Sequence, residues 1–153
     1  MSRRSQITMS AGEVETFLAD QRVVICATAG PRGWPHLMPL WYTIRDDEIW
    51  TWTYAKSQKV RNLERDDRAT LQVEDGVEYQ ELRGVMIEAR TVIHRDTDLV
   101  AEFGAELFAR YGSGATGPEF LEAVRAQAAK RVALQFVPQH VASWDHRTLG
   151  GVY

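Results

Sequence analysis

The stretch WTWTYAKSQKVRNLERD, residues 50–66, carries the clearest structural signal in this sequence. Two tryptophans alternate with threonines, which is the pattern of a β-strand. Beyond them, Val60 and Leu63 are spaced as on one side of a helix, so we expect a short helix over residues 57–66. Lysines stand at 56 and 59, although the positive end of the helix dipole disfavours cations there. Two interpretations stay open on these residues: an ordinary solvated helix start, or a bound anion such as phosphate.

Ser57 is the expected N-cap of this helix. A helix start leaves several backbone N–H groups without partners inside the helix, and they can bind an anion. Lys56 and Lys59 each reduce helix stability by about 0.3–1 kcal/mol at such a position unless an anion compensates. Both lysines therefore bear on the anion hypothesis.

Length and composition indicate one ordinary globular domain over residues 1–153. Hydrophobic residues make up 44% of the chain and charged residues 25%, and the net charge is −3. This charge argues against a nucleic-acid-binding protein, so an anion site has to be local. The start, MSRRSQITMS, leads into no apolar run, and no run approaches the roughly 20 residues of a membrane span. We expect a cytoplasmic protein with no signal peptide and no membrane contact.

The remaining pattern predicts a mainly β protein with inserted helices. Strands are expected at 22–29, 35–44, 48–54, 68–75, 79–95, 131–138 and 140–145. Helices are expected behind a capping box at Ser10, behind Asp96, and from Pro118. The first three strands should form two hairpins of an antiparallel meander. Pro39 restricts its strand to an edge or a bulge, and Gly84 is a candidate bulge. This order of elements is typical of a small β-barrel.

Several catalytic patterns are absent or out of place. GSGATG at 112–117 matches a dinucleotide-binding pattern by letter, but a helix precedes it, so we expect a helix-to-helix loop. The four histidines lack the spacing of a zinc site, and no G-x-S-x-G motif organises a hydrolase triad. The single cysteine, Cys26, lies in a predicted buried strand and is expected to be a core thiol.

Tryptophans concentrate on the second and third predicted strands. Trp50 and Trp52 should share one face, with Trp41 opposite them across the hairpin. They are either part of a barrel core or the wall of a site for a flat ring system.

The order of these features resembles the flavin and deazaflavin oxidoreductases with a split β-barrel, the superfamily of pyridoxamine 5'-phosphate oxidase. The likeness covers nearly the whole chain: residues 27–42, 49–76, 83–90 and 131–145. Its most specific part is SQKVRNL at 57–63, followed by the strand start at 67–69.

This resemblance implies an FMN-binding split barrel that pairs as a homodimer, with each cofactor in a groove at the interface. The cofactor ring would follow the second strand, and the phosphate would bind where the third strand meets the helix. The implied cofactor-binding residues are Leu37, Met38, Pro39, Leu40, Trp41, Trp52, Thr53, Ser57, Lys59 and Arg61. No metal is implied, and the catalytic residues are not identified.

Departures from the oxidase pattern favour the deazaflavin branch. Leu37, Tyr42 and Gln58 stand where the oxidase has basic residues. The resemblance therefore implies hydride transfer between coenzyme F-420 and a small organic acceptor. The alternatives are an FMN-dependent oxidoreductase of the pyridoxamine 5'-phosphate oxidase type, and a non-catalytic protein that binds a (deaza)flavin or a tetrapyrrole. Lys56, Arg61 and Arg65 could line a path for an acidic cofactor tail. We also expect Trp144 and the tail after Asp145 to approach a cofactor, in the same or the other subunit.

Overall fold

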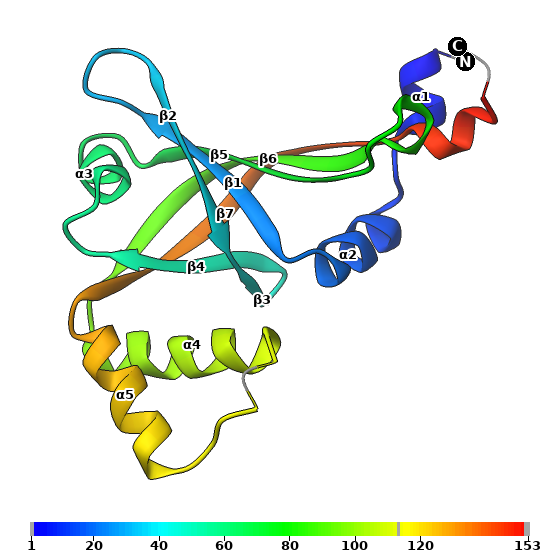
Figure 1. Ribbon diagram of the computed structural model, residues 1–153. Coiled ribbons are helices and arrows are strands. Elements are labelled where there is room, and N and C mark those ends of the chain that lie inside the picture. The colour runs from blue at the N-terminus through cyan, green and yellow to red at the C-terminus, as the bar shows by residue number, and fades with distance from the viewer. Residues whose placement is uncertain (1, 113, 152–153) are drawn as a thin grey trace.

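The computed structural model describes residues 2–112 and 114–151. Figure 1 shows a strongly curled antiparallel sheet, with helices at its ends and beneath it. The strands are β1 (Val23–Ala29), β2 (Pro35–Trp41), β3 (Thr43–Arg45), β4 (Glu48–Tyr54), β5 (Arg68–Asp75), β6 (Arg83–His94) and β7 (Arg131–Asp145). The helices are α1 (Arg3–Ile7), α2 (Ala11–Asp20), α3 (Gln58–Arg65), α4 (Thr97–Arg110) and α5 (Pro118–Ala128), with 3-10 turns η1 (Tyr79–Glu81) and η2 (His146–Leu149). No helix in these ranges is both long and apolar enough to cross a membrane.

The order of strands in the sheet is β2-β1-β5-β6-β7-β4-β3, and every pair is antiparallel. The two edge strands, β2 and β3, are consecutive in the chain and separated only by Tyr42. The two edges of the sheet are therefore joined at one residue, so the sheet must curl back on itself. The predicted mainly β, split-barrel fold is confirmed.

The predicted meander is wrong in one respect. The expected second strand, 35–44, divides at Tyr42 into two parts with different partners. Its first part pairs with β1, and only its last two residues, extended by Arg45, form a hairpin with β4. Thr43, rather than Trp41, therefore lies opposite Trp50. Pro39 lies on an edge strand, as its missing N–H requires.

The irregularity predicted at Gly84 lies elsewhere. The register shift falls between Glu88 and Ala89, opposite β7. Gly84 pairs regularly with Trp144, and a Cβ at Gly84 would overlap the indole ring of that tryptophan. The glycine is therefore needed for close approach of a ring, not for a bulge. The two strands predicted at 131–138 and 140–145 are one continuous strand, β7.

Two apolar cores lie on opposite sides of the sheet. The first fills the barrel with the inward residues of β1, β4, β5, β6 and β7, and α2 covers it. The second lies outside the barrel, where α4 and α5 pack on Trp50, Trp52 and Ala133. The helices begin as predicted: Ser10 and Glu13 form a capping box, Asp96 caps α4, and Pro118 opens α5.

Hydrogen bonds from the end of α4 link it to the end of α2 and to the junction between β2 and β3. Arg110 donates hydrogen bonds to the carbonyl oxygens of Leu18, Ala19 and Gln21, which end α2, and to the carbonyl oxygen of Tyr42. These carbonyls have no partner within their own elements, so one guanidinium satisfies groups from two segments. Tyr42, the residue between β2 and β3, is thereby linked to both α2 and α4.

Gly104 sets the distance between α4 and the sheet, and its substitution gives a direct test. A Cβ at Gly104 would lie 2.5 Å from Cζ3 of Trp52. We expect Gly104→Ala to lower the free energy of unfolding by about 1–3 kcal/mol, the usual cost of overpacking a core. The control is Gly12→Ala in α2, where no atom lies within 4 Å. This change should instead stabilise the protein by about 0.5–1 kcal/mol. Urea denaturation measures both, and a stabilised Gly104→Ala protein would contradict the packing described.

Candidate functional site at the start of α3

The junction between β4 and α3 is built by the stretch that dominates the sequence. β4 ends at Tyr54, and a hydrogen bond from the Ser57 N–H to the Tyr54 carbonyl, 3.0 Å long, turns the chain into α3. Ser57 is the N-cap by its extended backbone, as predicted, but its side chain makes no capping hydrogen bond. Its Oγ is shielded from solvent and has no partner among the described residues. A shielded hydroxyl without a partner at a helix start is suited to bind an anion.

Lys59 follows Ser57 by two residues, in the first turn of α3. Its side chain is only 6% exposed, and its Nζ donates one hydrogen bond, 2.8 Å long, to Oγ1 of Thr53. No carboxylate pairs with it within residues 2–112 and 114–151. Burial lowers the pKa of Lys59, and the positive charge of Arg131 lowers it further, although Cys26 opposes this. A buried ammonium with one neutral partner is costly unless an anion compensates it.

A polar network fixes α3 against β1. Asn62 is fully buried, and its amide donates to Oγ1 of Thr28 over 3.0 Å. Its carbonyl oxygen accepts from Nε2 of Gln58 over 2.8 Å. The first turn of α3 therefore has a fixed position relative to the barrel, because buried polar groups with satisfied partners are rigid.

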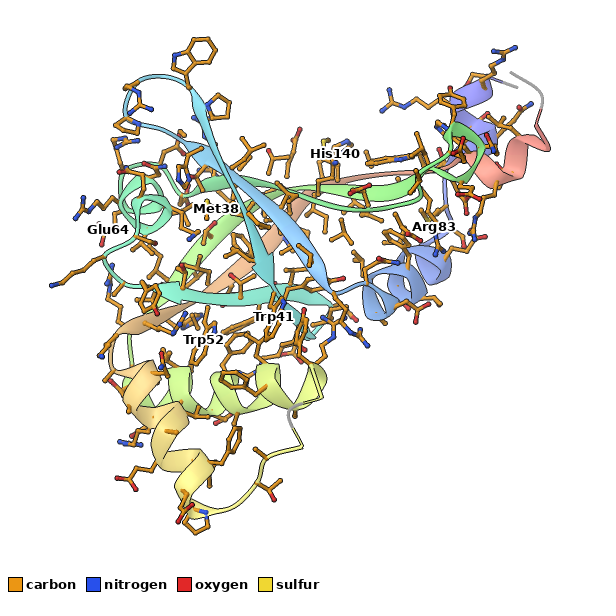
Figure 2. The ribbon with its side chains drawn as sticks, viewed as in Figure 1. Met38, Trp41, Trp52, Glu64, Arg83 and His140 are labelled. Atoms are coloured by element: carbon orange, nitrogen blue, oxygen red, sulfur yellow. The ribbon has the colours of Figure 1, made fainter. Side chains whose placement is uncertain are left out.

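β2 presents an exposed apolar edge near this helix. Leu37, Met38 and Trp41 are 57%, 40% and 49% exposed, Pro39 is also exposed, and Leu40 packs against the barrel core. Figure 2 shows Trp41 at the end of β2 near α4, whereas Leu37, nearer the start of the strand, lines a hollow together with Gln58 of α3. The strand thus runs from the helix start toward an exposed indole, the arrangement that a phosphate with an attached ring would require.

Trp41 is held by a contact that the sequence did not indicate. Its ring stacks on Tyr111, with centroids 4.1 Å apart and planes 9° apart. The Tyr111 hydroxyl accepts from the Tyr42 N–H and donates to the Arg22 carbonyl oxygen. The last turn of α4 therefore orients one end of β2. Only the three-dimensional fold brings residues 41 and 111 together, so no local pattern could have found this pair.

Trp52, one of the predicted cofactor-binding residues, is buried in the second apolar core. Its side chain is 9% exposed and packs beneath α4 in the second core. The Arg131 guanidinium lies 4.5 Å from its ring centroid and 4.1 Å from that of Tyr54. Arg131 is a second cation near Lys59, and its charge lowers the pKa of that lysine. Sequence analysis missed this residue because an arginine at a strand start is unremarkable by itself.

The three cations proposed for an outer path differ in their availability. Lys56 and Arg61 are exposed. Arg65 instead donates to the carbonyl oxygen of Ala29 over 2.6 Å, next to the turn between β1 and β2. Two of the three are therefore free to meet a ligand, and the third ties α3 to β1.

Trp144 and the segment after Asp145 are expected to approach a cofactor, and the structure of one subunit does not test this expectation. Trp144 pairs with Gly84, and η2 packs against α1, whose end of the molecule lies far from α3 in Figure 1. Within one subunit, residues 144–149 therefore lie away from α3, and their contact with a cofactor of the same subunit stays a prediction. Contact with the cofactor of a partner stays a prediction, and residues 152–153 lie outside the described part of the chain.

The remaining candidate groups give no sign of chemistry of their own. Burial raises the pKa of the Cys26 thiol to about 12, so it is an unreactive core side chain. In the described ranges, no three histidine, cysteine, aspartate or glutamate side chains gather where they could hold a metal ion. What remains is the hydrogen-bonded pair of Lys59 and Thr53, with the unpartnered Ser57 hydroxyl at the same helix start.

Comparison with known proteins places this geometry in a family. A crystal structure of a conserved hypothetical protein from Mycobacterium tuberculosis is 38% identical, with a TM-score of 0.89, over 100% of this chain and 95% of that one. A putative 5-nitroimidazole antibiotic resistance protein from Bacteroides thetaiotaomicron shares the fold at 13% identity, with a TM-score of 0.72, over 90% and 85% of the two chains. An F420 reductase shares it at 22% identity, with a TM-score of 0.68, over 87% and 98%.

No curated protein matches the chain by sequence. The sequence profile of pyridoxamine 5'-phosphate oxidase, however, matches residues 10–145, which include the whole barrel and α3. By this match, together with the split barrel itself, the chain belongs to the pyridoxamine 5'-phosphate oxidase family of flavin-type oxidoreductases.

Proposed function

We propose that this protein is an oxidoreductase that transfers hydride between a deazaflavin of the F-420 type and a small organic acceptor. The observation that carries the proposal is the buried ammonium of Lys59, which has no carboxylate partner in the described chain, at the same helix start as the unpartnered Ser57 hydroxyl. Both groups suit the phosphate of such a cofactor. A charged donor gives the stronger hydrogen bonds, and the free N–H groups of α3 add to them.

The exposed edge strand would complete the site. Leu37, Pro39 and Trp41 alternate along β2 and offer an apolar surface to a flat ring system. An edge with this much exposed apolar surface is also suited to be covered by a second copy of the chain. We therefore propose a homodimer, with the cofactor groove between β2 of one subunit and the surface of the other.

The protein's own contribution would be binding, orientation and exclusion of water. When bound, the deazaflavin supplies the redox chemistry, by giving or taking a hydride at its ring. Lys59 and Ser57 fix the phosphate end, and Trp41, held by Tyr111, fixes the wall at the ring end. No nucleophile, metal or acid–base pair from this chain is required in this proposal.

The charge of the site favours a deazaflavin over FMN. A terminal phosphate monoester carries nearly two negative charges, and a tight site for it uses several converging cations. Here Tyr42 is fully buried and donates its hydroxyl proton to the Leu18 carbonyl oxygen, and Gln58 is held by Asn62. Neither replaces the basic residues of the oxidase pattern. The F420 reductase among the structural neighbours is consistent with this preference.

A titration tests the choice of cofactor. We expect an F-420-type deazaflavin to bind the cofactor-free protein more tightly than FMN does, and its affinity to fall as salt rises, because its tail contacts are exposed. Quenching of tryptophan fluorescence should report both, since Trp41 is half exposed on β2. Tighter binding of FMN would defeat the deazaflavin assignment in favour of the FMN-dependent alternative. Binding without reduction of any acceptor would indicate a non-catalytic carrier.

Binding should also weaken at alkaline pH. The pKa of Lys59 is lowered mainly by burial, so the free protein loses this charge at a lower pH than an ordinary lysine would. As pH rises through that lowered pKa, affinity for the anionic cofactor should decrease. The Lys59→Met protein should bind weakly at every pH, without this decrease.

The same pKa shift has the opposite sign for stability. The unfolded chain keeps the Lys59 proton to higher pH, so this group makes folding more favourable as pH rises in that window. Its titration therefore cannot weaken binding by unfolding the protein. Dissociation constants measured from neutral pH upward check the expectation. An identical pH dependence in wild type and Lys59→Met would rule out Lys59 as the titrating group.

A further inference from the structure

A hollow of about 300 Å³ lies between the β1–β2 turn and the first residue of α3. Its wall includes the side chains of Arg32, Trp34, His36, Leu37 and Gln58. None of the residues that line it is acidic. Gln58 is the first residue of α3, so the hollow lies at the same helix start as the proposed phosphate site.

The turn that forms one side of the hollow is tight. The Gly30 N–H donates to the Trp34 carbonyl oxygen over 3.0 Å, and the Gly33 N–H to the Gly30 carbonyl oxygen over 3.2 Å. A Cβ at Gly30 would overlap the Trp34 carbonyl, so only glycine allows this closure. Arg65 braces the same turn from α3 through the Ala29 carbonyl oxygen. Arg32 and His36 are therefore presented by a braced loop.

Two polar groups of the hollow lack partners. Arg32 makes no ion pair or hydrogen bond with any residue of the described chain. Nδ1 of His36 is shielded from solvent and has no hydrogen-bond partner among the same residues. Shielded polar atoms are normally paired, so one without a partner on the wall of a hollow indicates a ligand that supplies the partner. A free guanidinium beside it selects for a negative charge, with a fork geometry that suits a carboxylate.

The position of the hollow agrees with this charge. β2 runs from Pro35, beside the turn, to Trp41, beside α4. The start of α3 adjoins the first half of the strand, because Gln58 lines the same hollow as His36 and Leu37. A ligand with its ring toward Trp41 and its phosphate at Lys59 would therefore direct whatever follows the phosphate into the hollow.

We propose that Arg32 and His36 form a carboxylate-binding pocket next to the phosphate site. The inference rests on the proposed function, because that function sets the direction in which the ligand lies along β2. The pocket itself can be tested separately. The carboxylate has two candidate sources: the acidic tail of the cofactor, or a separate organic acid that is the hydride acceptor. FMN ends at its phosphate and leaves the pocket unused.

The first arm of the test compares two forms of the deazaflavin, one with its carboxylate-bearing tail and one that ends at the phosphate. We expect Arg32→Gln to weaken binding of the tailed form about three- to tenfold, as for a partly exposed charge contact. His36→Leu should weaken it about tenfold, and His36→Asn, which keeps a donor near Nδ1, should recover part of the loss. Binding of the tail-less form should change less than about twofold in all three.

The matched control is Arg3→Gln. It removes the same charge from α1, at the opposite end of the molecule, and should leave both affinities unchanged. The second arm needs no cofactor. Glutarate is titrated into the cofactor-free protein, and the imidazole signals of His36 are followed by NMR in wild type and Arg32→Gln.

The possible outcomes distinguish the two sources of the carboxylate, and they distinguish failure of the pocket from failure of the proposed function. Selective loss of the tailed form supports the pocket and assigns it to the cofactor tail. No selectivity, with a glutarate-dependent shift of His36 that Arg32→Gln abolishes, supports the pocket and assigns it to a separate acid. If wild type binds neither deazaflavin but shows the glutarate shift, the proposed function fails and the pocket stands. Absence of both effects overturns the pocket.

Discussion

Replacing Lys59 by methionine should weaken binding of the deazaflavin by about 1.5–3 kcal/mol, the range for hydrogen bonds to charged groups. The reason is the isolation of this side chain, whose ammonium is buried and bonded only to Thr53 in the described structure. Methionine fills a similar volume without the charge. The fold should not lose stability, because a buried charge without a counter-ion is removed and only the Thr53 hydroxyl loses a partner.

Lys56→Met is the matched control. Lys56 precedes the same helix but is exposed, so its loss should cost less than about 1 kcal/mol of binding. Fluorescence titration gives the affinities, and urea denaturation gives the stabilities. Equal affinity in Lys59→Met and wild type would leave Ser57 and Lys59 as a plain helix start with no ligand.

Replacing Leu37 by aspartate should dissociate the proposed dimer and abolish cofactor binding at micromolar protein. Leu37 is 57% exposed at the middle of an apolar edge strand. A carboxylate there would have to be desolvated against the other subunit, which costs several kcal/mol for an unpaired charge. Sedimentation velocity reports the association state.

The control is Leu121→Asp, on α5. This leucine is 55% exposed, so the two substitutions are matched in chemistry and exposure but lie on different surfaces. Leu121→Asp should leave association and binding unchanged. A wild-type protein that stays monomeric at micromolar concentration would contradict the dimer and the interfacial groove together.

The local elements of this fold could be predicted from sequence because their signals are local. A capping box at Ser10, an aspartate cap at residue 96 and a proline at the start of α5 each fix a helix start within a few residues. Strand alternation in 50–54 is equally local. These features do not depend on what packs against them.

Partners between strands could not be predicted in the same way. A hairpin is the default for consecutive strands, and nothing near Tyr42 in the sequence shows that the strand changes partners there. Gly84 has two physical explanations, a bulge or a ring packed against it, and only the position of Trp144 decides between them. α1 carries no apolar face in its five residues, so periodicity could not reveal it.

The residues of the candidate site also fall into two groups, those indicated by a local motif and those brought to the site by the fold. Ser57 and Lys59 belong to one short motif, so the sequence could point to them. Arg131 and Tyr111 reach the site from parts of the chain more than 50 residues away. Their roles depend on β7 lying beside β4 and on α4 ending beside β2, which are properties of the assembled sheet.

The place of β7 between β6 and β4 also determines when the protein can fold during its synthesis. β4 emerges from the ribosome well before its main sheet partner, residues 131–136. Until then one edge of β4 stays open, and for most of that interval Trp50 and Trp52 also lack α4 and α5, the helices that cover them. Nascent chains with open strand edges and uncovered aromatic side chains are the form that chaperones hold. The nascent chain is therefore most prone to aggregate in the interval between the emergence of β4 and that of β7.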